Sequence, residues 1–252
     1  MVNARTLQLL SIPDIPEIEE GMNLSTIIWK SLEAAGIPLT HKDILVIAHS
    51  VVSKAEGRVV YRKDVEISEE AKAISEKNGF DPAHVELAIR EARSVVRTDG
   101  VLITETHHGF VCNFSGVDKS NAPPGSFILL PEDPDRSALV IQRNLEKISG
   151  LRLAVVISDT QGRPWRHGAI NVALGCAGIN AFKYNRGKRD LHGRELQYST
   201  VCQIDELASA AEPLMGQANE GTPVVIVRGY DYESGDDTAR SINRTKDEDL
   251  FR

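Results

Sequence analysis

The sequence contains few aromatic residues and few cysteines. Phenylalanine, tyrosine and tryptophan together make up 5% of its 252 residues, which is too few for the stacking surfaces that bind single-stranded nucleic acid. The three cysteines, Cys112, Cys176 and Cys202, lie far apart and form no CxxC pair, so neither a disulfide framework nor a zinc site is indicated. We therefore expect buried free thiols and no nucleic-acid partner.

An excess of positive charge and a long hydrophobic run are also lacking. The 36 acidic residues outnumber the 29 lysines and arginines and give a net charge of −7, whereas binding to polyanions or membrane surfaces needs a basic field. No stretch reaches the roughly 18–20 consecutive apolar residues of a membrane span, and the first residues do not resemble a secretory leader. These absences predict a cytoplasmic protein without a membrane partner, and they still allow a small phosphorylated ligand.

The hydrophobic pattern predicts helices and strands in an irregular order. Short apolar runs rich in branched residues predict buried strands over residues 43–48, 126–131, 153–158 and 223–230. Capping residues and helical spacing predict helices over residues 24–36, from 68, from 81 as far as 95, and over 135–149 and 205–215. A hairpin is expected around Gly109, and an exposed tail after Asp231.

The fold class follows from this order of elements. Helices and strands do not alternate regularly and a hairpin is present, which argues against a pure βαβ repeat. We predict an α+β fold with mixed sheets and flanking helices, as a single domain over residues 1–252. A division into two lobes is suggested by length alone, and the sequence marks no boundary.

Polar residues and glycine follow predicted strands in four segments, where loops often carry function. In the first segment, residues 49–58, Lys54 can hold a phosphate as a point charge. The spacing is not that of the GxxxxGK[ST] phosphate loop, and a solvated loop with internal ion pairs is an alternative. In the second, residues 113–121, Asp118 lies in a turn-like stretch, and a purely structural turn is the favoured interpretation.

The third segment, residues 158–168, has the strongest indication of function. Asp159 at a strand end, followed by Thr160, supplies the hard oxygen ligands that suit Mg²⁺ or Mn²⁺. Arg163 and Arg166 bring positive charge within a few residues of these ligands. We predict a metal and phosphate site in this loop.

The fourth segment, residues 215–222, joins a predicted helix to the last strand. Gly216 fits the left-handed position beyond a helix end, which would be a structural role. Gln217 could instead add a neutral oxygen ligand to a metal, and backbone amides nearby could contact a nucleotide.

Five motifs occur in one order along nearly the whole chain: SKAEGR (53–58), SGVDKSN (115–121), SDTQGRPWRHG (158–168), KRDLHGREL (188–196) and LMGQANEG (214–221). Together they resemble the coenzyme F420-0:L-glutamate ligase family. The resemblance implies that GTP drives the joining of L-glutamate to the phospholactyl carboxylate of a deazaflavin, coenzyme F420-0, with further γ-linked glutamates. It also implies a two-lobed α+β fold and an intertwined homodimer. A C-terminal nitroreductase-like domain, fused in some relatives, is not expected here.

The resemblance also implies roles for individual residues. Two divalent ions, Mg²⁺ or Mn²⁺, with K⁺ as a further cation, would be held by Asp118, Asp159, Thr160 and Gln217. The nucleotide would contact His49, Ser50, Lys54, Asn121, Met215, Gly216, Ala218 and Asn219. The catalytic groups would be Lys54, Asp159, Arg163 and Arg166. At two of these positions, Gln217 and His49, the sequence departs from a relative that carries a glutamate ligand and a small hydroxyl residue.

Two other functions fit the same segments. One is another metal- and NTP-dependent carboxylate–amine ligase with a different acceptor, and the other is a nucleotide-binding module without catalysis. In the ligase interpretation, the γ-phosphoryl group of GTP activates the acceptor carboxylate as an acyl phosphate, because a free carboxylate is a poor electrophile. No sequence feature identifies the base that deprotonates the incoming amine.

Overall fold

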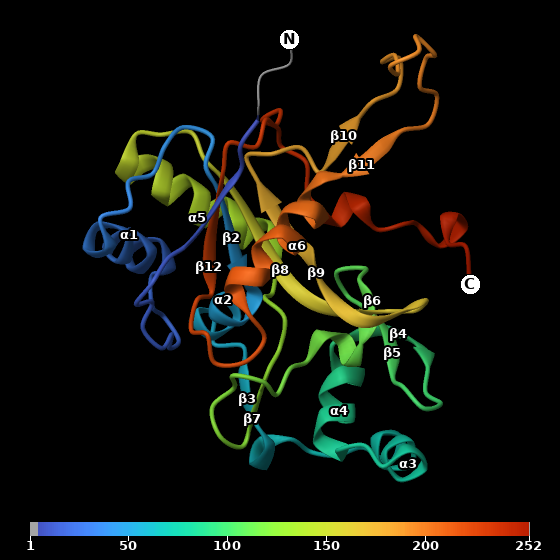
Figure 1. Ribbon diagram of the computed structural model, residues 1–252. Coiled ribbons are helices and arrows are strands. Elements are labelled where there is room, and N and C mark those ends of the chain that lie inside the picture. Colours follow the sequence, from blue (N-terminus) through green and yellow to red (C-terminus); the bar gives the residue numbers. More distant parts are fainter. Residues whose placement is uncertain (1–4, 252) are drawn as a thin grey trace.

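The structure, a computed structural model, describes residues 5–251 and contains one large sheet and three small ones (Figure 1). The large sheet has the order β1-β12-β2-β8-β9. Its strands are β1 (Gln8–Ser11), β2 (Ile44–Ala48), β8 (Ala154–Arg163), β9 (Arg166–Ala177) and β12 (Val224–Arg228). Strands β2 and β8 are parallel, and the other neighbours are antiparallel. The predicted α+β fold with mixed sheets is confirmed.

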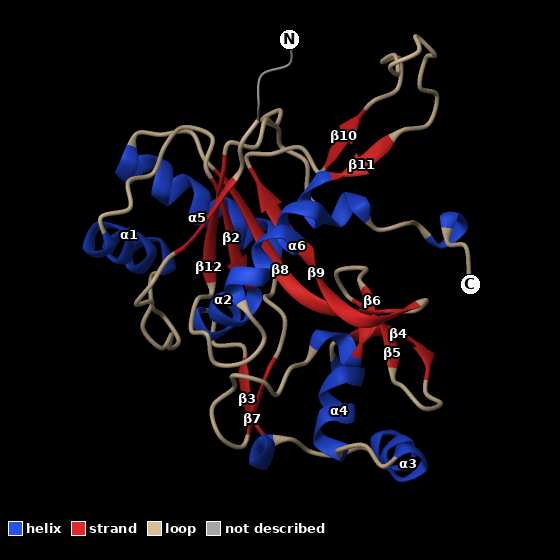
Figure 2. Ribbon diagram, in the orientation of Figure 1, coloured by secondary structure: helices blue, strands red, loops and turns tan. Residues whose placement is uncertain are grey.

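Helices cover both faces of the large sheet (Figure 2). One face packs against α1 (Leu24–Ala35), α2 (His49–Ala55) and α5 (Pro134–Ser149), and the other packs against α6 (Gln203–Met215). Successive residues of a strand point to opposite faces. In β2, Leu45 and Ile47 therefore join the first core and Ile44 and Val46 the second. Burial on both faces explains why this strand is a continuous apolar run.

Capping residues set the helix boundaries much as the sequence predicts. Helix α1 begins after Asn23, whose side chain accepts a hydrogen bond from the Thr26 amide at 3.0 Å. It ends at Gly36 in the left-handed conformation, with φ of 64°. Helices α3 (Glu69–Asn78) and α4 (Pro82–Arg90) likewise begin after Ser68 and Asp81, which cap them with their side chains.

Residues 59–128 form a small lobe, and the rest of the described chain is called the large lobe. The chain enters and leaves the small lobe through a pair of antiparallel strands, β3 (Val59–Tyr61) and β7 (Ser126–Ile128). Helices α3 and α4 pack there beside a sheet of β4 (Ala92–Arg97), β5 (Ile103–Thr106) and β6 (Val111–Asn113). Since the entry and exit strands pair, the small lobe is an excursion of the chain between α2 and α5.

The remaining elements lie at the periphery. Strands β10 (Phe182–Tyr184) and β11 (Thr200–Cys202) form the base of an arm that projects from the large lobe (Figure 1). Four short 3-10 helices are η1 (Arg62–Asp64), η2 (Phe114–Gly116), η3 (Ala239–Ile242) and η4 (Lys246–Glu248). Within residues 5–251, no helix combines the length and apolarity that crossing a bilayer would require.

Three expectations about local structure were wrong. Helix α4 ends at Arg90, and Val95 lies on β4, because the branched residues there pair with β5. Residues 49–55, expected as a loop, form α2. The tail after Asp231 is partly anchored, since Tyr232 and Ala239 are buried in the core under α6.

The segment 158–168 also differs from the expected loop. Strand β8 continues through Asp159 and Thr160 to Arg163, and β9 returns from Arg166. The two strands pair along their polar halves, from Ser158 with Ala173 to Arg163 with Arg166. Backbone pairing thus extends the strand beyond its apolar run, so the predicted site residues lie on a hairpin.

Candidate active site

The parallel pair β2 and β8 creates one wall of the site. Their register sets Ala48 opposite Ser158, so the next residues, His49 and Asp159, lie side by side where the parallel pairing ends. Ligands commonly bind beyond the carboxyl ends of parallel strands. The His49 Nε2 atom lies 3.4 Å from Asp159 Oδ1, and both side chains are largely buried.

A bulge in the β8–β9 ladder lies beside Asp159. The register shifts between Ile157 and Ser158, and such a bulge re-aims the side chains that follow it. The Asp159 carboxylate accepts a hydrogen bond from the Thr160 amide at 2.7 Å and a longer one from Gln161 Nε2 at 3.4 Å. These contacts leave the acid beside His49 at the strand edge.

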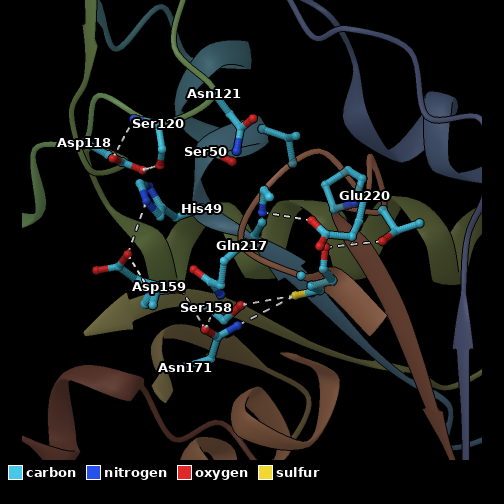
Figure 3. Close-up of a pocket in the computed structure, with 18 of the residues that line it drawn as sticks. His49, Ser50, Asp118, Ser120, Asn121, Ser158, Asp159, Asn171, Gln217 and Glu220 are labelled. Atoms are coloured by element: carbon cyan, nitrogen blue, oxygen red, sulfur yellow. Dashed lines mark hydrogen bonds and ion pairs between the residues drawn. The ribbon is translucent and has the colours of Figure 1, made fainter. Parts of the chain in front are cut away.

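The small lobe supplies Asp118 to the opposite wall. Its backbone exchanges hydrogen bonds with Ile128 at 2.9 and 2.8 Å. Its carboxylate accepts hydrogen bonds from the amide and the hydroxyl of Ser120, at 2.8 and 2.5 Å. This is the turn predicted for the segment, and it also points an acid toward the site, where His49 lies between Asp118 and Asp159 (Figure 3).

The two acids change the titration of the histidine between them. Burial of the His49 imidazole lowers its pKa. The charge and hydrogen bonding of Asp159, together with the charge of Asp118, outweigh this effect and hold the pKa above the ordinary value for histidine. A positive charge is therefore favoured between the two carboxylates.

A cavity of about 600 Å³ opens between these walls. The predicted residues that line it are His49, Ser50, Lys54, Asp118, Asn121, Asp159, Thr160, Met215, Gly216, Gln217, Ala218 and Asn219. Arg163 and Arg166 lie away from it. They occupy the turn of the β8–β9 hairpin, where Arg163 donates hydrogen bonds to the carbonyls of Gly168 and His167 at 3.1 and 2.9 Å.

Lys54 is a buried cation in this cavity. Its side chain is 7% exposed and its Nζ atom lies 2.5 Å from Glu17 Oε1, whereas the Glu17 side chain is 74% exposed. Glu17 belongs to the proline-rich loop before α1 and also lines the cavity. A buried ammonium needs an anionic partner, and here that partner faces solvent, where an incoming anion could replace it.

Comparison with known proteins shows which family the chain belongs to. The family model described as F420-0:Gamma-glutamyl ligase matches residues 13–229. The chain is 46% identical to the Coenzyme F420:L-glutamate ligase of Methanopyrus kandleri, with 98% of each chain covered. It is 41% identical to the protein of the same name from Methanothermobacter thermautotrophicus, with 98% of this chain and 99% of the relative covered, and 35% identical to that from Archaeoglobus fulgidus, with 98% and 96% covered.

The chain belongs to the F420-0:gamma-glutamyl ligase family. It is therefore an enzyme of the ligase class. The small lobe and every residue that lines the cavity lie within the residues that match, so the family model spans both walls of the cavity.

The donor atoms of this ligase cavity suit a hard divalent cation. Mg²⁺ and Mn²⁺ are commonly bound by one or two carboxylates, with the remaining ligands from neutral oxygens and phosphates. Asp118 and Asp159 supply the carboxylates, and the described residues contain no group of three acidic, histidine or cysteine side chains arranged for a metal. Gln217 donates its amide nitrogen to Glu212 and Asn171, at 3.2 and 3.4 Å, and its amide oxygen adds a neutral donor to the set.

Asn171 is a residue of the ligase site that the sequence analysis missed. Its buried side chain accepts hydrogen bonds from Thr160 Oγ1 at 2.7 Å and Gln217 Nε2 at 3.4 Å, and it donates to Met215 Sδ at 3.9 Å. Asn171 thus connects two of the four predicted segments. It lies opposite Thr160 in the β8–β9 pair, so a hairpin prediction would have indicated it.

Glu220, a second missed residue, organises the loop after α6. Its carboxylate accepts a hydrogen bond from the Ala218 amide at 2.8 Å and lies against Gly216. Gly216 has φ of 69° and ψ of 178°, which is an extended conformation almost confined to glycine and not the expected left-handed cap. A Cβ atom at this position would lie 2.0 Å from the Glu220 carboxyl carbon, so a side chain there would also displace the Glu220 carboxylate from its present position.

The cysteine beside the cavity is not a nucleophile. Burial and the nearby Asp159 charge raise the pKa of Cys112 to about 12. A thiol with such a pKa remains protonated at neutral pH and does not react as a thiolate. Cys112 and Cys176 are buried free thiols as expected, and Cys202 is half-buried.

Proposed function

We propose that this ligase uses GTP to join L-glutamate to the phospholactyl carboxylate of coenzyme F420-0, and that it adds further γ-linked glutamates to the product. The observation that carries the proposal is the cavity itself, in which carboxylates from two lobes and a buried lysine face one another. Phosphoryl transfer needs positioning and charge stabilisation more than covalent help from the protein. The printed names of the relatives support the acceptor and the amino acid.

Lys54 and the neighbouring nucleotide contacts would bind the phosphates of GTP. The ammonium group would exchange its contact with Glu17 for a phosphate oxygen, since both compete for the same donor. We assign the remaining nucleotide contacts to the polar and backbone groups that line the same cavity, namely His49, Ser50, Asn121, Met215, Gly216, Ala218 and Asn219.

Asp118, Asp159, Thr160 and Gln217 would hold two divalent ions, Mg²⁺ or Mn²⁺, with K⁺ as a further cation. When bound, such ions neutralise the charge that develops on phosphate oxygens. The two aspartates would also fix the distance between the lobes, because each comes from a different wall.

Two steps would then join the substrates. An oxygen of the acceptor carboxylate attacks the γ-phosphorus of GTP, GDP leaves, and an acyl phosphate forms. The amine of glutamate attacks the acyl carbon, inorganic phosphate leaves, and the amine loses a proton as the amide forms. Arg163 and Arg166, although outside the cavity, would add positive charge near the entering anions. We also propose that the protein acts as a homodimer.

The test is an assay with GTP, Mn²⁺, L-glutamate and the deazaflavin acceptor, in which mass spectrometry detects added glutamyl units. We expect one or more units per acceptor, with one GDP and one phosphate released for each. Release of GDP without a mass increase would mean a different acceptor, and no GTP turnover would mean a binding module. Asp231→Asn is a suitable control variant, because the Asp231 side chain is 95% exposed and lies outside the cavity. The proposed homodimer is tested separately, by measuring the molar mass of the protein in solution with light scattering.

A further inference from the structure

A second cavity, of about 390 Å³, lies where the two lobes and the C-terminal segment meet. Its walls come from the β5–β6 hairpin, from β9, from the bases of β10 and β11, and from residues 242–251. Three phenylalanines, Phe110, Phe182 and Phe251, give it an aromatic lining. We propose that this cavity binds the tricyclic deazaflavin ring of the acceptor, an inference that rests on the function proposed above.

Gln161 connects the second cavity to the first. Its side chain lines both, and its amide nitrogen lies 3.4 Å from Asp159 Oδ2. The acceptor has its reacting carboxylate at one end and its ring at the other. When the carboxylate lies in the first cavity near Asp159, the rest of the molecule must continue into a space that adjoins it. The second cavity adjoins the first at Gln161, which lines both.

A third cavity, of about 800 Å³, is a less suitable place for the ring. It lies between α1 and α5 and shares no lining residue with the first cavity. The ring and the reacting carboxylate belong to one molecule, so this cavity is not placed to hold the ring while the carboxylate lies near Asp159.

The lining of the second cavity matches the chemistry of a deazaflavin ring. Ligand cavities are typically about 300–1,000 Å³, mostly apolar, with a few polar groups that fix orientation. Val172 and Leu250 add aliphatic contacts to the three aromatic rings. These side chains suit the flat faces of a tricyclic ring, for which stacked and edge-on contacts are favourable.

Asn243 adds an amide nitrogen without a hydrogen-bond partner among residues 5–251. It lines the second cavity, and its Nδ2 atom is buried without a hydrogen-bond acceptor among the described residues. A buried amide donor without a partner is costly. The pyrimidinedione edge of a deazaflavin carries carbonyl oxygens that can accept from this donor after a small shift of the side chain. An aliphatic ligand would offer no hydrogen-bond acceptor to this amide.

The proposal is tested by binding of the acceptor without GTP or glutamate, measured from the fluorescence anisotropy of the deazaflavin. Val172→Trp would fill the second cavity, and the double variant Leu250→Ala with Phe251→Ala would remove two exposed lining side chains without touching the core. We expect each to weaken acceptor binding at least about tenfold and to leave the Kd for GTP unchanged. Val140→Trp, in the third cavity, and Leu191→Ala, on the arm, are matched controls that should bind normally.

Acceptor binding at the wild-type level by both cavity variants would overturn the proposal while leaving the ligase reaction in place. If the wild-type protein adds no glutamate to this acceptor and does not bind it, the proposed function fails and the ring site fails with it. A ring-free acceptor, the phospholactate ester of ribitol, provides a second measurement. It should bind equally to the wild type and the variants, and a loss of its binding in the cavity variants would contradict a site for the ring.

Discussion

The two walls of the candidate active site are built in different ways. On the large lobe, Asp159 lies on β8 and His49 directly follows β2, and the register of these neighbouring strands is fixed by the backbone hydrogen bonds of a five-stranded sheet. On the small lobe, Asp118 is held by one bridge to Ile128 and by two hydrogen bonds from Ser120. One acid is thus positioned by sheet register, and the other by contacts that single substitutions can remove.

The hydrophobic cores of the two lobes also differ, and the large lobe has the more extensive core. The large lobe has two extended clusters of buried residues on either side of its sheet. The small lobe has two short clusters, around Phe127 and around Val85. Since hydrophobic stabilisation grows with buried apolar area, we expect the small lobe to open more easily and the wall with Asp118 to be the more adjustable.

The largest effect is expected when both walls lose their acid. Asp159→Asn and Asp118→Asn should each lower kcat about 10³-fold, because in the proposed function each removes a carboxylate that would hold the divalent ions. Residues that act as one unit give non-additive losses, so the double variant should fall no more than about tenfold below either single variant. Single-turnover assays with unchanged circular dichroism test this, and multiplicative losses would show that the walls act independently.

Core truncation compares the stability of the lobes. Leu145→Ala, under the large sheet, should lower the free energy of unfolding by about 3 kcal/mol, because it leaves a cavity in a fully buried core. Leu87→Ala in the small lobe should cost about 2 kcal/mol. Its effect on hydrogen exchange should be confined to residues 59–128. Equal acceleration of exchange in β2 and β8 by Leu87→Ala would mean that the lobes unfold as one unit.

The sequence predicted the regular parts of both lobes well. The caps at Asn23 and Gly36 are local hydrogen-bonding signals, so the bounds of α1 could be predicted. Apolar runs located β2 and the first half of β8. The polar half of β8 could not be predicted in this way, because its strand conformation depends on pairing with β9, about ten residues further along the chain.

The site was predictable to a different extent on each wall. Asp159 followed from its place after an apolar strand, whereas residue chemistry alone favoured a structural turn at Asp118, and only the resemblance implied a ligand there. Asn171 carries no local signal, since its role arises from the strand pair that sets it opposite Thr160. Asn171 was missed because the β8–β9 hairpin was not predicted, and Glu220 because its contacts with Gly216 and Ala218 form only in the folded loop.

Replacing the buried lysine tests the large-lobe wall without removing an acid. Lys54→Met keeps the length of the side chain but removes its charge, and it should weaken GTP binding about 10- to 100-fold in calorimetry. The Tm should change little, because the partner, Glu17, is 74% exposed and remains solvated. Lys147→Met, on the exposed face of α5, is the matched control. Unchanged GTP affinity in Lys54→Met would exclude the phosphate contact.

Acidification should weaken the small lobe through Asp81. Burial raises the pKa of this carboxyl, but contacts with Lys119 and Arg62 outweigh burial and hold the pKa below its ordinary value. Its contribution to stability is therefore complete above the unfolded pKa of about 4 and is lost as the pH falls through the lower folded value. Asp81→Asn keeps the N-cap of α4 and should cost about 1 kcal/mol at pH 7. In urea titrations, the difference in free energy of unfolding between variant and wild type should be smaller at pH 3 than at pH 7. An equal difference at both pH values would contradict a stabilising role of the ionised Asp81.

The smallest effect is expected where Asp118 loses one of its two local contacts. Ser120→Ala removes the hydroxyl donor but keeps the backbone amide that also binds the carboxylate, so the acid should become less ordered without leaving the wall. One hydrogen bond of this kind contributes about 0.5–1.5 kcal/mol, and we expect kcat to fall about threefold with little change in the Kd for GTP. Ser126→Ala, which loses a bond to the Pro123 carbonyl in the same loop, should leave kcat unchanged. If both variants lost activity equally, general loosening of the loop would account for the effect, and Asp118 would be held as firmly as Asp159.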